Sequence, residues 1–222
     1  MGKKQRLILL AASAMFFFTG FEQIYADEMT DKSISWLKAQ IVPNDTIPNP
    51  VQERRRLILS YRLPESDPAY PYISGKSFIY DDALAVIAFT MKGEYKYSEY
   101  ILSAMERLLN DDGSIWFSCN TQNSWPSPGD HYGAVIRSGA LAWAGYAPVY
   151  YLLSREADEP GFVENDYLAG QYLEMAVKIA GYLKNRQITD KNDKRFGLVT
   201  GGEGSYELEY SSDKNKVEEV FR

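Results

Sequence analysis

Three similar helix ends recur along this chain of 222 residues, and their regular spacing limits the folds open to it. The segments are SWLKAQ, ERLLND and GYLKNR, whose leucines Leu37, Leu109 and Leu183 are 72 and 74 residues apart. Each segment is followed by a polar loop and then by apolar or aromatic residues. A near-constant period of this length favours stacked helical hairpins that bury a shared core. We therefore predict an all-α protein of helical hairpins with long loops and a few short extended segments.

Apolar residues at helical spacing define the expected elements. They predict helices over residues 32–41, 81–92, 96–109, 132–154 and 165–187. Asp31 and Asn165 are the expected N-caps of the first and last helices, and Gly93 fits the left-handed position after the second. Gly139 and Gly145 should let a neighbouring helix approach closely. Asp111 and Asp112 precede Gly113 in NDDGS, which is typical of a turn.

The first 26 residues have the layout of a secretory signal. A basic start, MGKKQR, is followed by 15 uncharged, mostly apolar residues and then by the acidic DEMTDK, with Ala26 as the expected last residue of the signal. The apolar run is shorter than the roughly 20 residues of a membrane-spanning helix. We expect an exported protein, periplasmic or extracellular, with a domain over residues 27–222. An uncleaved signal would be its one route to a membrane.

Charge and loop chemistry exclude several partners. Without residues 1–26 the chain has 21 basic and 29 acidic residues, a net charge of −8. Nucleic acid is not an expected partner, because phosphate contacts need a basic surface. The segment TGGEGSYE lacks the Lys and Ser/Thr that a phosphate-binding loop requires, so we expect no nucleotide.

One cysteine and one histidine offer little for cofactor or nucleophile chemistry. Cys119 has no second cysteine to pair with, so we predict a small buried side chain. A Cys119–His131 nucleophilic pair is the alternative, although no spacing favours it. His131 would need two or three further ligands to hold a metal. No cofactor is expected.

Four segments carry a resemblance to a known group of proteins. GKSFIYDDALAVIAF, LLNDDGSIWFS, RSGALAWAGYA and RFGLVTGGEGSY resemble exported bacterial proteins of the six-hairpin, (α/α) toroid glycosidase-like superfamily. The resemblance covers about residues 31–222. It implies a ring of helical hairpins with a sugar-binding cleft at one end, and a carbohydrate-active protein, glycoside hydrolase-like. The alternatives are a non-catalytic carbohydrate-binding or surface protein on the same scaffold, and a helical scaffold for protein partners.

The expected toroid is incomplete. A complete ring has about twelve helices, whereas this sequence predicts five or six. The final segment, KNKVEEVFR, begins a further amphipathic pattern with Val217, Val220 and Phe221, from which we expect the start of another helix. We therefore expect the chain to be the N-terminal part of a larger protein, or a truncated copy that is an inactive fragment.

Carboxylates at the hairpin ends are the expected catalytic residues. Glycoside hydrolysis usually uses two carboxyl groups that face one sugar bond. The candidates are Asp82, Glu203, Asp81 and Asp130, and we expect Asp82 and Glu203 to face the same end of the ring. The alternative is structural: Asp81 would cap a helix beginning at that residue, Asp82 would interact with its positive end, and Asp130 would cap the helix over residues 132–154.

Aromatic and polar side chains near these carboxylates are the expected substrate-binding residues. Sugar C–H faces pack on aromatic rings, while hydroxyl groups bond to polar side chains. The residues are Tyr80, Trp116, Trp125, His131, Tyr132, Arg137 and Tyr206. Trp116 and the adjacent Phe117 could line the cleft or instead fill the core. Arg137 is expected inside an apolar helix, paired with Asp82 or Asp130.

Overall fold

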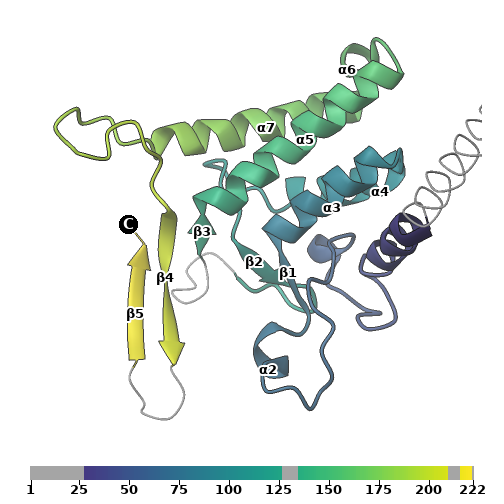
Figure 1. Ribbon diagram of the computed structural model, residues 1–222, viewed down its shortest axis with the longest axis horizontal. Coiled ribbons are helices and arrows are strands. Elements are labelled where there is room, and N and C mark those ends of the chain that lie inside the picture. The colour runs from purple at the N-terminus through teal and green to yellow at the C-terminus, as the bar shows by residue number, and fades with distance from the viewer. Residues whose placement is uncertain (1–27, 127–134, 210–215, 222) are drawn as a thin grey trace, which may run out of the picture. The chain divides into compact units, whose positions relative to one another are not determined.

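The computed structural model describes residues 28–126, 135–209 and 216–221, and it divides into two compact units, Met1–Ala39 and Gln40–Arg222 (Figure 1). In the first unit, residues 28–38 form a helix. This helix begins and ends earlier than predicted, so Asp31 lies within it rather than at its N-cap. Ile41 belongs to the second unit, where it forms an isolated antiparallel bridge with Ile58.

The second unit is mostly helical, with short antiparallel strand pairs. Its helices and strands follow the chain in the order η1 (Gln52–Arg54), α2 (Tyr70–Ile73), β1 (Lys76–Phe78), α3 (Ile79–Met91), α4 (Tyr95–Glu106), β2 (Ser118–Asn120), β3 (Ile136–Arg137), α5 (Ser138–Asp158), α6 (Phe162–Asn165), α7 (Tyr167–Asn185), β4 (Gly202–Glu209) and β5 (Lys216–Phe221).

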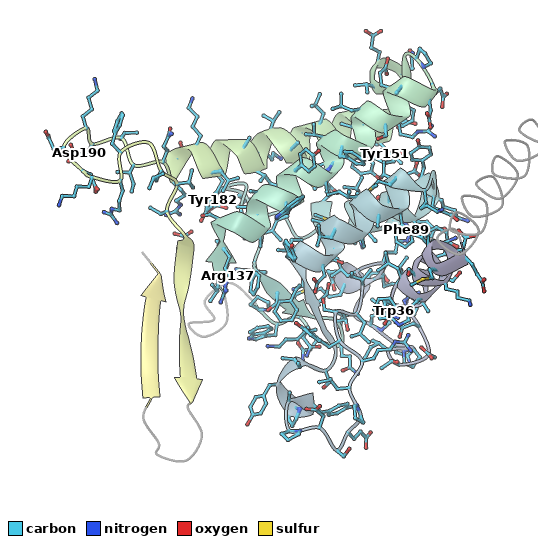
Figure 2. All side chains as sticks on the ribbon, viewed as in Figure 1. Trp36, Phe89, Arg137, Tyr151, Tyr182 and Asp190 are labelled. Atoms are coloured by element: carbon cyan, nitrogen blue, oxygen red, sulfur yellow. The ribbon has the colours of Figure 1, made fainter. Side chains whose placement is uncertain are left out.

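Four helices build the core of this unit. Helix α3 packs on α4 and α5, and α5 packs on α7 (Figure 1). Phe89 of α3 and Tyr151 of α5 are fully buried. Figure 2 shows where both side chains lie. The Tyr151 ring meets the Tyr172 ring of α7 edge to face at 5.7 Å, and the Tyr151 hydroxyl donates to Glu99 of α4 at 2.6 Å. These contacts join three helices around one apolar centre.

Several predicted helix ends and turns are confirmed. Gly93 has φ +69° directly after α3, and its amide donates to Thr90 at 3.0 Å, as a left-handed helix end requires. Gly113 has φ +88° after Asp112, whose carboxylate accepts from the Ser114 amide at 2.9 Å. Gly145 lies against α7, because a Cβ there would be 2.8 Å from Ile179 Cγ2.

Other predicted helical features are wrong. The helix expected over residues 132–154 has its described start at Ser138, since Ile136 and Arg137 form strand β3, and it continues to Asp158. The N-cap of α7 is Asp166, whose side chain accepts from the Ala169 amide at 3.1 Å, rather than Asn165. A Cβ at Gly139 would meet nothing within 4 Å, so no helix packs closely there.

The C-terminal segment is extended rather than helical. Strand β5 pairs antiparallel with β4 from Gly204↔Phe221 to Glu209↔Lys216, and β4 pairs with β3. The expectation of a helix through Val217 and Phe221 is therefore wrong. Every residue from Lys216 to Phe221 pairs with β4. This pairing outweighs the weak helical spacing of three apolar residues.

Two pairs of helices pack side by side in the described part of the chain. Among the described residues, α3–α4 and α5–α7 pack as neighbouring helices without closing a toroid. No helix in the described segments has both the length and the apolar character needed to cross a membrane.

Candidate functional site

Two strand-to-helix junctions lie next to each other and form the base of the site. Strand β1 runs directly into α3 at Ile79, and β3 runs directly into α5 at Ser138. The Ile79 amide donates to the Phe117 carbonyl at 3.0 Å, and the Ser138 amide donates to the Gly201 carbonyl at 3.0 Å. These backbone bonds bring the loop before β2 and the loop before β4 to the starts of the two helices.

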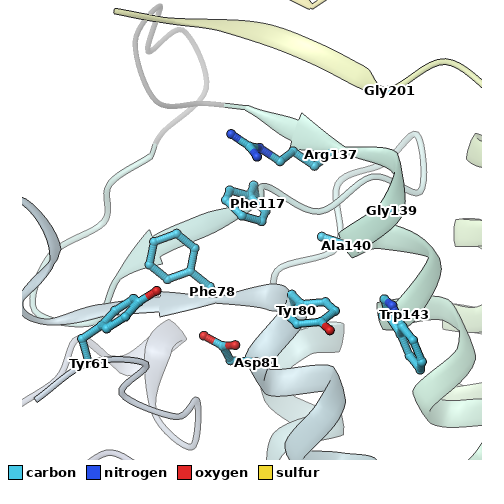
Figure 3. Close-up of a pocket in the computed structure, with 10 residues that line it drawn as sticks. All are labelled: Tyr61, Phe78, Tyr80, Asp81, Phe117, Arg137, Gly139, Ala140, Trp143 and Gly201. Carbon is cyan, nitrogen blue, oxygen red and sulfur yellow. The ribbon is translucent and has the colours of Figure 1, made fainter. Parts of the chain in front are cut away.

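A cavity of about 740 Å³ opens over the two junctions (Figure 3). This volume is in the range of small-molecule sites. The first junction, the second junction and the neighbouring loops all contribute to its lining, which consists of Tyr61, Phe78, Tyr80, Asp81, Phe117, Arg137, Gly139, Ala140, Trp143 and Gly201.

Aromatic rings form most of the cavity walls. Tyr80 and Trp143 meet edge to face at 6.2 Å, and each side chain keeps about 40% of its surface exposed. On the other wall Phe78 meets Phe117 at 5.2 Å and Tyr61 at 5.7 Å, again edge to face. Exposed rings held by other rings present rigid apolar surface at little entropic cost.

Two charged side chains of opposite sign complete the lining. The Arg137 guanidinium lies over the Phe117 ring, with Cζ 4.5 Å from the ring centroid. Asp81, in the first turn of α3, is half-buried among the lining residues, and within the described segments no hydrogen bond holds its carboxylate. Figure 3 shows Asp81 and Arg137 on different parts of the wall. A ligand could therefore meet an acceptor and a donor together with the rings.

The two catalytic candidates of α3 lie in different surroundings: Asp81 lines the cavity, whereas Asp82 is buried in the protein. Helix α3 begins at Ile79 with Phe78 as its N-cap, so Asp81 does not form the helix cap that the structural alternative required. Asp82 is 1% exposed, and its carboxylate accepts from the Ile58 amide at 2.9 Å and the Ser77 hydroxyl at 2.6 Å. Burial raises the pKa of Asp82 to about 7, although the Ile58 and Ser77 hydrogen bonds oppose the shift. Asp82 therefore joins β1, α3 and the Ile58 segment inside the protein.

Glu203 lies in β4, opposite Ile136 of β3. Its carboxylate accepts from the Tyr182 hydroxyl at 2.6 Å and pairs with the Arg186 guanidinium at 2.5 Å. Burial, followed by the Glu203 hydrogen bond, raises the pKa of Tyr182. Neither Glu203 nor Asp82 is among the residues that line the cavity, so this structure does not bring the two expected catalytic carboxylates together there.

The remaining predicted site residues fall in several places. Tyr80 and Arg137 line the cavity, but Arg137 lies in β3 before α5, not within the helix as expected. Trp116 lines a separate cavity, and Trp125 packs under the Lys76 ammonium at 4.5 Å. The residues Asp130, His131 and Tyr132 lie outside the described residues, and the side chain of Tyr206 in β4 also lies outside them.

Three cavity aromatics were not singled out as binding residues from sequence: Tyr61, Phe78 and Trp143. Phe78 and Trp143 lie close to helix starts, Trp143 five residues after Ser138, whereas Tyr61 carries no such signal. Cys119 is buried in β2 as predicted, and burial raises its pKa to about 12, which disfavours a nucleophilic thiolate. Within the described segments no group of three or more His, Cys, Asp or Glu side chains is arranged to hold a metal ion.

No protein-family model, curated protein or solved structure matches the chain.

Proposed function

We propose that the cavity over the β1–α3 and β3–α5 junctions binds carbohydrate. The observation that carries the proposal is the combination of exposed, mutually packed rings with one carboxylate and one guanidinium in a single cavity. Sugars have apolar C–H faces and a rim of hydroxyl groups, so they suit a site with both kinds of surface. A purely apolar ligand would not bond to the Asp81 carboxylate, which no hydrogen bond holds within the described segments.

Each part of the lining has a role in this proposal. Trp143 and Tyr80 offer ring surface on which one sugar face packs. The Asp81 carboxylate accepts hydrogen bonds from sugar hydroxyls, and the Arg137 guanidinium donates to sugar oxygens. The exposed Tyr146, whose ring lies 6.0 Å from Trp143, would extend the aromatic surface to a second sugar unit.

Binding is better supported than hydrolysis. Hydrolysis by paired carboxylates would need a second carboxyl group facing Asp81 across the ligand. The lining contributes Asp81, whereas Asp82 is buried and Glu203 is bonded to Tyr182 and Arg186. A glycoside hydrolase-like activity therefore remains the second candidate, favoured by the resemblance of the four sequence segments.

The resemblance also gives the proposal a structural setting. We propose that α3–α4 and α5–α7 are hairpins of an (α/α) toroid, with the junctions at the end that carries the cleft. The packing of α3 on α4, of α5 on α7 and of α3 on α5 supports this arrangement. A signal peptide at residues 1–26 would place the cavity outside the cytoplasm, where polysaccharides are available.

The test is a titration of the full chain with neutral oligosaccharides of several backbones, such as cello-, xylo-, manno- and malto-oligosaccharides. Calorimetry should detect saturable binding of at least one of them, and Trp143→Ala should weaken it. Trp36→Ala is the matched control, because Trp36 is also exposed but belongs to the first unit. Absence of binding to every backbone, or equal loss in both variants, would contradict the proposal.

The same mixtures separate binding from turnover. Products released during incubation and abolished by Asp81→Asn would favour the hydrolase candidate. Intact oligosaccharide, bound but not cleaved, would favour a binding protein.

A further inference from the structure

A second cavity, of about 280 Å³, lies on the other side of the segment before β2. Trp116 lines this cavity, while the next residue, Phe117, lines the first. The second cavity also contains Arg54, Arg107, Asn110 and Ser124. The carbohydrate proposal gives no role to the residues that line the second cavity, so the two cavities can be tested independently.

Arg54 is the unusual member of this lining. It is only 5% exposed, and its Nε atom is buried with no hydrogen-bond partner. The short helix η1 fixes its position, because the Val51 amide before η1 donates to the Thr121 carbonyl at 3.0 Å. In the described segments no carboxylate forms an ion pair or hydrogen bond with the Arg54 guanidinium. A charge so deeply buried is normally paired, because desolvation without compensation is costly.

A second guanidinium stands beside it. Arg107, at the C-terminal end of α4, donates to the Ser103 carbonyl at 2.8 Å and to the Arg55 carbonyl at 2.6 Å. The second of these bonds ties α4 to the residue that follows Arg54. Burial, and then the neighbouring Arg56, lower the pKa of Arg107. The cavity lining therefore holds two guanidinium groups against one carboxylate, that of Glu53, and an anion would balance the remaining positive charge.

We propose that this cavity binds a small oxyanion, the carboxylate of an acidic sugar or a phosphate group, on Arg54 and Arg107. A guanidinium can donate two parallel hydrogen bonds to two oxygen atoms of a carboxylate or of a phosphate. Arg54 could therefore bind either group. The Trp116 ring offers a surface for the carbon skeleton that carries the anion. The cavity volume of about 280 Å³ restricts the ligand to a small molecule. Glu53 lines the same cavity as an exposed carboxylate, and its charge lowers the affinity for every anion alike.

The experiment titrates the full chain with sodium phosphate, sodium glucuronate and glucose at ionic strength matched with sodium chloride. Tryptophan fluorescence is the readout, since Trp116 lies in the cavity wall. Saturable change with phosphate alone assigns the phosphate source, saturable change with glucuronate alone assigns the sugar carboxylate, and glucose should give no change at this site. Trp116→Phe should remove the signal.

Arg54→Met should weaken anion affinity at least about tenfold, since it removes the charge and keeps an apolar chain of similar length. Arg195→Met is the charge-matched control, because Arg195 is exposed and pairs with Asp193 away from this cavity. If Arg54→Met does not fold by circular dichroism, Arg107→Met takes its place with the same expected loss. No saturable response to either anion in the wild-type protein, or an unchanged response in the folded arginine variant, would overturn the proposal.

Discussion

The first turn of α3 carries an aspartate on each of two sides, and the surroundings of these two aspartates differ. On one side Tyr80 and Asp81 line an open cavity with Trp143. On the other, Asp82 is buried and hydrogen bonded to Ile58 and Ser77. Consecutive residues of a helix point about 100° apart, so one step along the chain moves a carboxylate from a ligand site into the scaffold. A pair of acidic residues in a sequence is therefore no evidence that both act on a ligand.

The largest expected difference between the two carboxylates is in the pH dependence of stability. Asp82 has a pKa of about 7 in the folded protein and an ordinary value of 3.8 when unfolded. The folded state therefore holds the proton more tightly. The stabilising effect is complete below pH about 4, falls as the pH rises and is lost above pH about 7, for a total on the order of 4 kcal/mol.

Urea unfolding between pH 3 and 8 measures this effect. The free energy of unfolding of the wild type, relative to Asp82→Asn, should fall through that window and then level off, because asparagine does not ionise. Asp81→Asn should retain the wild-type slope. An identical pH profile for wild type and Asp82→Asn would show that Asp82 is not buried as described.

The next effect is the loss of the Asp82 hydrogen bonds. Asp82→Ala leaves the Ile58 amide and the Ser77 hydroxyl without their partner inside the protein. At pH 5 we expect the free energy of unfolding to fall by about 3 kcal/mol, as urea unfolding can measure. Asp81→Ala should change it by less than about 0.5 kcal/mol. Equal losses in the two variants would remove the distinction between the sides of the turn.

Substitutions on the cavity side of the turn should change ligand affinity rather than stability. Removing the ring of Trp143 or Tyr80 takes away apolar surface that a sugar would cover, and it also removes the edge-to-face contact between the two rings. We expect each alanine variant to weaken oligosaccharide affinity about tenfold, or ~1.4 kcal/mol. Calorimetry of both variants tests this, with thermal unfolding as a check that the fold is kept. Unchanged affinity in both would place the sugar elsewhere.

Two glycines of α5 extend the comparison at a smaller scale. A methyl group at Gly139, on the cavity side, meets nothing within 4 Å, while one at Gly145 lies 2.8 Å from Ile179. Gly139→Ala should stabilise the protein by about 0.5 kcal/mol through helix propensity, and Gly145→Ala should destabilise it by roughly 1 kcal/mol. Thermal unfolding of the two variants measures the difference, and the opposite order of stability would contradict the packing of α5 on α7.

The sequence predicted the parts of this fold that depend on local patterns. Helices α3, α4 and α7 follow from apolar spacing, and the turns at Gly93 and Gly113 follow from residue type. The helical prediction for β5 failed because strand pairing with β4 is a contact between separate segments. A short amphipathic pattern carries no information about such a partner.

The site shows the same limit. Tyr80, Asp81 and Arg137 were singled out from sequence, and all three line the cavity. Sequence alone did not show which of Asp81 and Asp82 would face the cavity, because that depends on which side of α3 packs against the rest of the protein. Trp143 was missed because its place opposite Tyr80 depends on how α5 packs against α3, and spacing within one helix does not determine that register.

The most direct test compares Asp81→Asn with Asp82→Asn in one calorimetric titration, using an oligosaccharide that binds the wild-type chain. Both substitutions replace a carboxylate by an amide of similar size, one residue apart, so they differ mainly in which side of the turn they change. We expect Asp81→Asn to weaken binding about tenfold, since it removes a charged acceptor from the cavity, and Asp82→Asn to leave the affinity within about twofold. Loss of affinity in Asp82→Asn with wild-type affinity in Asp81→Asn would contradict the account.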